Sequence, residues 1–347
     1  MISTPLAINN FSRYPVADAY HPSVVHISNG WNGHRFWMAQ TPYSVGHIEP
    51  YQSRFELPCI LYSDDGVKWT PIPDNPVDDL SIKDIEEQNY LSDPHLILKN
   101  GVLELYYRYT ILTDKQLLGN KTLLLRKTSR NGFDWSDREI IADLRDADEV
   151  LIWGDQIISP AVIWKDNLYY CWYVDASSYI RERHVRMTTS TDGIHWSKNV
   201  LCNLHDADII PWHLDMQYYD DRFQMLLFDI NNQILAHYSS CDAITFTDCR
   251  ILLRPSHKIR DYYSNSVYRA SSVKAKGSIY LYISGHNGER CSIGLWKTID
   301  FKQLKPVRGL DLFTYFREYH IGQKYYLIVL NKSKEYIYSV LKRWGII

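Results

Sequence analysis

Three carboxylates interrupt apolar, strand-like runs in this 347-residue chain, where they could take part in acid–base chemistry. Asp93 opens the run Asp-Pro-His-Leu-Ile-Leu, Glu56 precedes Leu-Pro-Cys-Ile-Leu, and Asp215 lies within Trp-His-Leu-Asp-Met-Gln. A carboxylate at the edge of a core is costly unless it is hydrated, paired or used. We therefore predict that these three residues are catalytic. Asp93 also fits an Asx turn before proline, Glu56 a surface ion pair with an arginine, and Asp215 a buried pair.

Other polar and aromatic residues stand where similar runs begin or end. Histidine can hold a sugar or a metal there, arginine can bind a carboxylate or phosphate through two hydrogen bonds, and tryptophan can stack on a sugar ring. Each can equally be structural: a satisfied histidine, an arginine paired with a nearby acid, or a packed core ring. The residues that we predict to bind substrate are His21, Arg108, Ser159, Asp175, Trp212, His213, Arg269 and His286.

An internal repeat indicates the elements that must position these residues. The repeat is a hydrophobic strand followed by Ser, a turn with Asp-Gly or Asn-Gly, and an aromatic residue. Asp-Gly and Asn-Gly accept the positive φ of a hairpin turn, over which the aromatic ring packs. Three clear copies occupy residues 62–69, 128–135 and 189–196, and two decayed copies occupy residues 239–246 and 295–301.

A second motif precedes each copy of the first, and together they define five units. It consists of a short apolar strand, a polar turn and an aromatic-rich strand, and its copies begin at residues 21, 93, 159, 213 and 269. Four antiparallel strands repeated in this way are typical of propeller blades. We predict an all-β fold, a five-bladed β-propeller, as a single domain over residues 1–347. A pair of β-sandwiches would explain the strands but not the fixed order of the motifs.

The predicted fold also predicts where chemistry would occur. In a propeller the first strands of the blades line the centre, and their starts lie at one mouth. The ends of the second strands and the starts of the third reach the same mouth because consecutive strands are antiparallel. Binding sites collect at such strand ends. The three carboxylates and the predicted substrate-binding residues should therefore meet there.

The end of the chain and its aromatic residues give two further expectations. Residues 324–330 and 336–341 have strand-like patterns, which we expect to complete the last blade or to cap its side. The chain contains 27 Tyr, 11 Trp and 10 Phe, mostly in the expected second strands and turns, where they would pack blade against blade. Tyr43, Trp153 and Trp212 are exceptions that could stack on sugar.

Composition excludes several classes of partner and location. The net charge of −2 does not suit a nucleic-acid-binding surface. No apolar run approaches the length of a membrane span, and residues 1–20 lack the parts of a secretory signal. We therefore expect no membrane insertion, and either a cytoplasmic location or release by a route without a signal peptide. The six cysteines form no Cys-x-x-Cys pair, and we expect buried free thiols rather than a zinc site or disulfides.

The chain resembles the five-bladed propeller glycoside hydrolases of families 43, 32 and 130. The features that carry the resemblance are the pair Asp93-Pro94 at a blade start, the repeated Ser-x-Asp-Gly-x-x-Trp motif, and five units over residues 15–310. His21 and Ser159 depart from it, since these families have Asp in the first and third blades, and Asp215 stands where they have a fourth-blade Glu. The chain is also similar to propeller proteins of bacteria and phages that are associated with surface polysaccharides.

The resemblance implies a glycoside hydrolase that acts on a carbohydrate, which we expect to be a bacterial surface polysaccharide or oligosaccharide. Carboxylates on different blades suit the wide spacing of an inverting mechanism. In this hypothesis Asp93 is the general base, Glu56 the general acid and Asp215 an orienting or pKa-tuning group, and the last two roles are exchangeable. The alternatives are a glycoside phosphorylase or glycosyltransferase, and a glycan-binding propeller without catalysis.

No cofactor is predicted. The sequence contains no His-x-His, His-Glu-x-x-His or EF-hand pattern, so no residue is assigned as a metal ligand. Some hydrolases of this fold hold a cation in the channel, and the resemblance therefore allows a cation such as calcium there. The sequence makes no prediction of oligomeric state.

Overall fold

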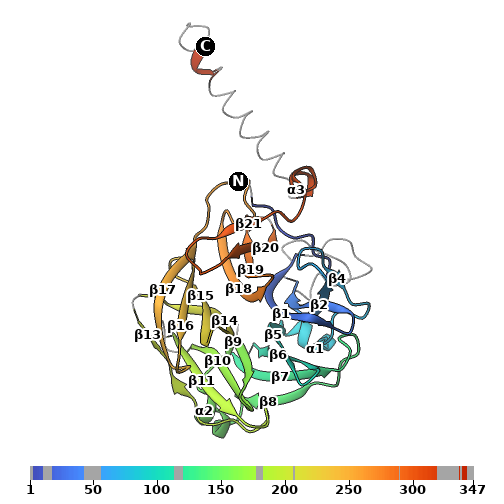
Figure 1. Cartoon of the computed structure of the whole chain (residues 1–347), viewed down its shortest axis with the longest axis vertical. Helices are drawn as coiled ribbons and strands as arrows, with labels where there is room; N and C mark the ends of the chain where they lie inside the picture. Colours follow the sequence, from blue (N-terminus) through green and yellow to red (C-terminus); the bar gives the residue numbers. More distant parts are fainter. Residues whose placement is uncertain are drawn as a thin grey trace.

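Five sheets follow one another around a central axis in the computed structural model of the chain (Figure 1). The structure describes residues 3–10, 18–42, 56–112, 120–176, 183–205, 208–288, 290–318, 336 and 338–341. Each sheet has four antiparallel strands in chain order, and in blade 4 a short parallel strand joins the outer edge. The predicted five-bladed all-β propeller is confirmed.

The strands of each blade run in chain order from the centre outward. Blade 1 contains β1 (Tyr20–Trp31), β2 (His34–Thr41), β3 (Cys59–Ser63) and β4 (Thr70–Pro71). Blade 2 contains β5 (Tyr90–Lys99), β6 (Val102–Ile111), β7 (Lys121–Ser129) and β8 (Glu139–Asp143). Blade 3 contains β9 (Ile158–Lys165), β10 (Leu168–Ala176), β11 (Arg183–Ser190) and β12 (Val200–Leu201). Blade 4 contains β14 (Pro211–Tyr219), β15 (Arg222–Asp229), β16 (Ile234–Ser240) and β17 (Thr245–Leu253), with β13 (Asn203–Leu204) beside β17. Blade 5 contains β18 (Ser266–Ala275), β19 (Ser278–His286), β20 (Cys291–Thr298) and β21 (Lys305–Val307).

The ring of blades closes between the first and the last. The inner strands β1, β5, β9, β14 and β18 contact one another in this order, and β18 also contacts β1. The N-terminal segment reinforces the closure. The N–H of Leu6 donates to the carbonyl of Ile293 in β20 at 2.8 Å, and the N–H of Leu310 donates to the carbonyl of Pro5 at 2.7 Å. The start of the chain therefore lies along blade 5 before the chain enters blade 1.

A similar turn follows the third strand of every blade, at the end opposite the starts of the inner strands. In blade 1 the Ser63 hydroxyl donates to Asp65 Oδ1 at 3.1 Å and accepts from the N–H of Gly66 at 2.9 Å. The equivalent hydroxyls of the next three blades are Ser129, Ser190 and Ser240. The left-handed residue of the turn is Gly66 (φ 78°), Gly132 (φ 83°), Gly193 (φ 81°), Ala243 (φ 71°) or Phe301 (φ 59°). The predicted hairpin turn is thus present even where its sequence has decayed.

The helices α1 (Ile82–Glu86), α2 (Ala147–Trp153) and α3 (Leu312–Glu318) lie outside the blades. None of the described helices is long and apolar enough to cross a membrane. The strand predicted at residues 336–341 is wrong where the structure describes it, because residues 338–341 are helical. The strand predicted at residues 324–330 lies outside the described residues. Blade 5 is completed by β21 instead.

Aromatic rings form much of the core between the blades, as predicted. Trp153, an expected candidate for sugar stacking, is buried against Tyr173 and Trp196 and therefore belongs to this core. Tyr43, another candidate, lies outside the described residues. The cysteines are free thiols, of which Cys59, Cys171, Cys202 and Cys291 are buried, Cys249 is half-buried and Cys241 is exposed.

Candidate active site at the mouth of the propeller

Every inner strand has a register irregularity near the end where it begins, which we call the mouth. Three residues there have left-handed backbone without being glycine: His21 (φ 49°), Asp93 (φ 53°) and Ser159 (φ 54°). His213 and Arg269 occupy the corresponding places in blades 4 and 5. Bulges and left-handed residues are common at functional sites, where they redirect side chains at a cost in backbone strain.

Asp93 is the centre of the side-chain cluster at the mouth and is fully buried. Arg108, from β6 of the same blade, forms an ion pair with Asp93, its Nε lying 2.6 Å from Oδ2, while its Nε–H donates to the Ser92 hydroxyl at 2.8 Å. The N–H of Ser159 donates to the same oxygen of Asp93 at 3.2 Å. Burial alone would raise the pKa of Asp93, but the charge of Arg108 above all holds it well below its ordinary value. Asp93 is therefore ionised at neutral pH and is a weak proton acceptor.

The other oxygen of Asp93 faces two imidazole rings. His213 Nδ1 lies 3.3 Å and His21 Nε2 3.8 Å from Asp93 Oδ1, and one ligand atom of each residue lies within 4.8 Å of the others. Burial lowers the pKa of both histidines, against the attraction of Asp93, so both rings are neutral at pH 7. Two imidazoles and a carboxylate suit a transition-metal dication and leave a coordination position for water. Calcium fits this donor set less well because it prefers oxygen ligands.

Arg269 adds a second guanidinium group to the same carboxylate. Its Nη1 lies 3.7 Å from Asp93 Oδ1, its side chain is buried, and none of its nitrogens has a hydrogen-bond partner among the described residues. Two guanidinium groups on one carboxylate oppose the charge of a metal cation. A cation held here would therefore require a further negative ligand, such as hydroxide or an oxyanion of the substrate.

Glu56 supplies the second carboxyl group of the mouth. It precedes β3, and its carbonyl accepts the N–H of Leu91 at 3.1 Å, which holds it beside the start of β5. Burial, and then the charge of Asp93, raise the pKa of Glu56 to about 8, although Arg108 and the Ser92 hydroxyl oppose this shift. Glu56 therefore carries a proton at neutral pH while Asp93 does not. Neighbouring carboxyl groups with separated pKa values are typical of acid–base sites.

A second layer of side chains joins each inner strand to the next. Each side chain bonds to the backbone of the following inner strand over 2.9 to 3.1 Å. The five side chains are Ser23, His95, Ser159, Asp215 and Ser271. The Ser159 hydroxyl is engaged with both backbone groups of Leu214, so at the mouth only its N–H reaches Asp93. This layer gives Ser159 and Asp215 a structural role that the sequence did not predict.

Asp215 is the acidic member of this layer. Burial raises the pKa of Asp215 to about 7, although Arg269 and the N–H of Ser272 oppose the shift. Its Oδ1 lies 3.5 Å from Nδ1 of His95, whose pKa burial lowers to about 3. The catalytic role of Asp215 stays a prediction, and its place one layer below the mouth favours the orienting part of that role.

Aromatic rings border the histidines. The ring of Tyr268 lies 4.4 Å from that of His213 and 5.5 Å from that of His21, and it stacks on Tyr20 at 4.7 Å. Trp212, predicted to bind substrate, is half-buried and donates through Nε1 to the Tyr268 hydroxyl at 2.9 Å. Trp212 thus lies next to the histidine pair, where it can still serve as a stacking surface.

Two predicted substrate-binding residues are not in the contacts around Asp93. Asp175 accepts the N–H groups of Asp155 and Gln156 and pairs with Arg186 at 2.6 Å, so it fixes the loop before β9. His286 accepts the N–H of Gly288 at 3.3 Å, in the loop that follows β19. Their assignment as substrate-binding residues stays a prediction, with loop support as the role that their contacts indicate.

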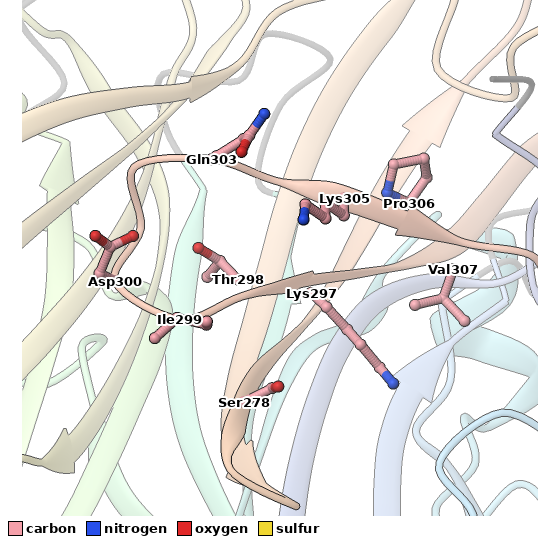
Figure 2. A pocket seen from close by; sticks show the side chains of 9 residues that line it. All are labelled: Ser278, Lys297, Thr298, Ile299, Asp300, Gln303, Lys305, Pro306 and Val307. Carbon is pink, nitrogen blue, oxygen red and sulfur yellow. The ribbon is translucent and has the colours of Figure 1, made fainter.

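The opposite end of blade 5 contains a separate pocket of about 360 Å³ (Figure 2). Its lining residues are Ser278, Lys297, Thr298, Ile299, Asp300, Gln303, Lys305, Pro306 and Val307. In Figure 2 the side chain of Lys297 extends away from Asp300, so the charged groups do not converge. The mouth, where buried acids, imidazoles and guanidinium groups do converge, is therefore the candidate active site.

Sequence reasoning missed three residues of this region. His95 stands two residues after Asp93, as Asp215 does after His213, so the aligned blade starts contained a signal for it. Tyr268 precedes Arg269 as Trp212 precedes His213. Arg183 begins β11, the third strand of its blade, which is the kind of position that singled out Glu56.

The sequence of the chain is similar to that of a known enzyme over part of its length. No family model matches the chain. The chain is 23% identical over 234 residues to the A type blood N-acetyl-α-D-galactosamine deacetylase of Flavonifractor plautii. That match covers 58% of this chain and 29% of the relative, so it spans less than a third of the relative's length.

Solved structures resemble the whole propeller. The crystal structure of an N-acetylgalactosamine deacetylase from F. plautii in complex with blood group B trisaccharide has a TM-score of 0.63 at 18% identity, covering 86% of this chain and 95% of that one. RS223 β-xylosidase has a TM-score of 0.60 at 13% identity, with 85% and 97% covered. The GH32 β-fructofuranosidase of Bombyx mori has 0.59 at 13%, with 85% and 63% covered. This chain has the fold of the five-bladed propeller glycosidases. The predicted resemblance is confirmed at the level of the fold.

Proposed function

We propose that this protein is a glycan-acting hydrolase that removes the acyl group of an N-acylated amino sugar, with a divalent transition-metal ion held by His21, Asp93 and His213. The observation that carries the proposal is the convergence of one ligand atom from each of these residues within 4.8 Å at the mouth. Where the resembling glycosidases have Asp in the first blade, this chain has His21. Imidazole in place of that carboxylate removes a negative charge and adds a metal ligand.

The residues around this set suit the cleavage of an amide. A metal ion there would polarise the amide carbonyl and lower the pKa of a bound water. A neighbouring cation would also lower the pKa of Glu56 and so supply its ionised form. Glu56 would accept a proton from the water as it attacks the carbonyl carbon, and would donate it to the nitrogen as the C–N bond breaks. The products are a carboxylic acid and an amino sugar.

The comparisons support this direction. The sequence relative and one of the similar structures are both N-acetylgalactosamine deacetylases, and other similar structures are glycosidases. An enzyme that acts on glycans is the coarser conclusion that they support together. An N-acetylated hexosamine in a glycan is the substrate class that we propose.

A glycoside hydrolase is the second candidate, and one observation favours it. Glu56 is protonated at neutral pH beside an ionised Asp93. A protonated and an ionised carboxyl group are the pair that glycosidases use as acid and base. However, Asp93 is tied to Arg108, and the pKa of Asp93 is low, which weakens it as a base.

The two candidates release different products, so one experiment separates them. The full chain is incubated with oligosaccharides that end in N-acetylgalactosamine or N-acetylglucosamine, and released acetate and new reducing ends are both measured. We expect acetate without new reducing ends, loss of activity after treatment with EDTA, and recovery with Zn²⁺, Mn²⁺ or Co²⁺ but not with Ca²⁺. New reducing ends that form with EDTA present would overturn the proposal in favour of the glycosidase.

A further inference from the structure

We propose that Arg183, stacked on Trp212, forms a subsite for an anionic group of the glycan (a carboxylate, sulfate or phosphate) next to the reacting sugar. The inference extends the proposed function, and it rests on that function because the metal-ligand set defines where the reacting sugar lies. It concerns binding only, so it can fail or succeed independently of the chemistry.

The geometry of the subsite is set by two aromatic side chains. The guanidinium carbon of Arg183 lies 4.0 Å from the centre of the Trp212 ring, within the range of a cation–π stack. Trp212 is itself fixed by its hydrogen bond of 2.9 Å to the Tyr268 hydroxyl. An arginine that stacks on an aromatic face directs its N–H groups outward, parallel to the ring. This arrangement suits bidentate binding of an oxyanion.

The charge of Arg183 has no counter-charge in the part of the chain that the structure describes. No ion pair of Arg183 is found there, and its Nη1 is buried without a hydrogen-bond partner. Burial lowers the pKa of Arg183, which reflects the cost of partly removing a guanidinium group from water. An anionic ligand would remove this cost. Other half-buried arginines form ion pairs with acidic residues, as Arg126 does with Glu139 and Arg186 with Asp175.

The neighbouring mouth is also positive. Two guanidinium groups lie against the one carboxylate of Asp93, with Arg108 Nε 2.6 Å from Oδ2 and Arg269 Nη1 3.7 Å from Oδ1. A positive site attracts an acidic glycan over longer distances than a hydrogen bond and does so less at high salt. The mouth therefore favours the same sign of ligand as Arg183.

The subsite is close to the proposed reaction centre without being part of it. The Trp212 ring lies 5.7 Å from that of His213, and Tyr268 separates Trp212 from His21. Arg183 reaches Trp212 from β11 of the preceding blade. A sugar on the metal-ligand set would thus place its neighbouring unit beside Arg183.

Binding of simple acidic sugars tests the subsite. Glucuronate, glucose 6-sulfate, glucose 6-phosphate and glucose are titrated into the full chain, with tryptophan fluorescence and calorimetry as readouts. The variants are Arg183→Gln and, as a matched control, Arg222→Gln, an arginine of blade 4 that pairs with Asp248 at the opposite end of the strands. The three anions separate carboxylate from sulfate and phosphate.

We expect at least one acidic sugar to bind more tightly than glucose, and Arg183→Gln to weaken that binding by about tenfold, the size of one charge-assisted hydrogen bond. Arg222→Gln should leave it unchanged. Equal binding of acidic and neutral sugars, or equal weakening by both variants, would overturn the proposal. An anion whose binding survives Arg183→Gln but is lost with EDTA occupies the metal-ligand set, and this result also overturns it. None of these outcomes depends on whether acetate is released.

Discussion

The two ends of the blades obey different rules. At the far end, blades 1 to 4 use the same serine-bonded turn, and all five blades place a left-handed residue in it, whether glycine, Ala243 or Phe301. At the mouth, the corresponding residues belong to four types: His21, Asp93, Ser159, His213 and Arg269. Repetition at one end reflects a shared folding task, since each turn must reverse the chain. Variation at the other end brings different chemical groups, an acid, two imidazoles, a guanidinium group and a backbone N–H, to one place.

The second layer of side chains combines a repeated structural task with residues of different types. Each inner strand is bonded to the next by a side chain, but the side chains differ in type. Blade 3 has Ala161 two residues after its start, and Ser159 of the mouth makes the bond in its place. A residue at the mouth can therefore stabilise the fold rather than take part in catalysis. Substitutions of different mouth residues should accordingly affect stability and turnover to different extents.

The largest expected effect is on turnover, from His213→Gln. His213 has Asp93 Oδ1 as its polar neighbour at 3.3 Å, and both ring nitrogens lack a hydrogen bond among the described residues. Loss of the imidazole should therefore change stability little. We expect acyl release to fall about a thousandfold, equivalent to about 4 kcal/mol of transition-state stabilisation. Acetate release under single-turnover conditions measures it.

The control for this change is His237→Gln in the same blade. His237 is also buried, but the hydrogen bond that the described residues give it lies within blade 4, where its Nε2 is 2.8 Å from Gln224 Oε1. We expect it to lower the free energy of unfolding by about 1 kcal/mol without a change in turnover. If both variants lost turnover equally, the distinction between the two ends of the blades would be wrong.

The next effect is on stability, from Gly132→Ala at the far end. A Cβ at Gly132 would lie 2.2 Å from the buried ring of Trp37, and the residue has φ +83°. We expect the free energy of unfolding to fall by about 2–4 kcal/mol, from overpacking and left-handed strain together. Urea unfolding measures the change, and turnover of the folded fraction should stay normal.

Gly101→Ala separates the two contributions. Gly101 has φ +77°, but a Cβ there would meet nothing within 4 Å. It should cost only the backbone strain, about 1–2 kcal/mol. Equal losses for the two variants would show that packing of the repeated turn against the neighbouring blade contributes nothing.

The fold was predictable from sequence because its cause is repeated. Asp-Gly and Asn-Gly before Trp mark a turn wherever they occur, and three clear copies were enough to locate the two decayed ones at 239–246 and 295–301. The end of the chain was not predictable in this way. Residues 338–341 belong to a short apolar run that periodicity alone cannot assign to a strand or a helix, and these residues are helical.

The site was predictable as a place but not as a set of contacts. Asp93 and Glu56 stood out as acids beside apolar runs, and both lie at the mouth. The second layer could not be read from one blade, because a bond such as that of Asp215 to the N–H of Ser272 spans 57 residues. The pairing of Arg183 with Trp212 likewise depends on the distance between blades, which no local pattern encodes.

A further expected effect is the pH dependence of stability that Glu56 contributes at the mouth. Its pKa is about 8 in the folded chain, against an ordinary value of 4.5. Between these values the unfolded chain loses the proton that the folded chain retains, so stability falls as the pH rises from 4.5 to 8. We expect this loss in protein treated with EDTA, in which no bound cation lowers the pKa of Glu56.

Glu56→Gln removes this titration and should flatten the slope, so that the variant equals or exceeds the parent in stability at pH 8. Urea unfolding between pH 4.5 and pH 8.5 gives the two curves. Asp175→Asn is the matched control, because Asp175 pairs with Arg186 away from Asp93 and should leave the slope in place. Asp215, whose pKa burial raises to about 7, contributes a part of the slope in both proteins. A slope as steep in Glu56→Gln as in the parent would therefore mean that Glu56 is ionised in the folded chain, and the proposed contrast between a protonated Glu56 and an ionised Asp93 would then fail.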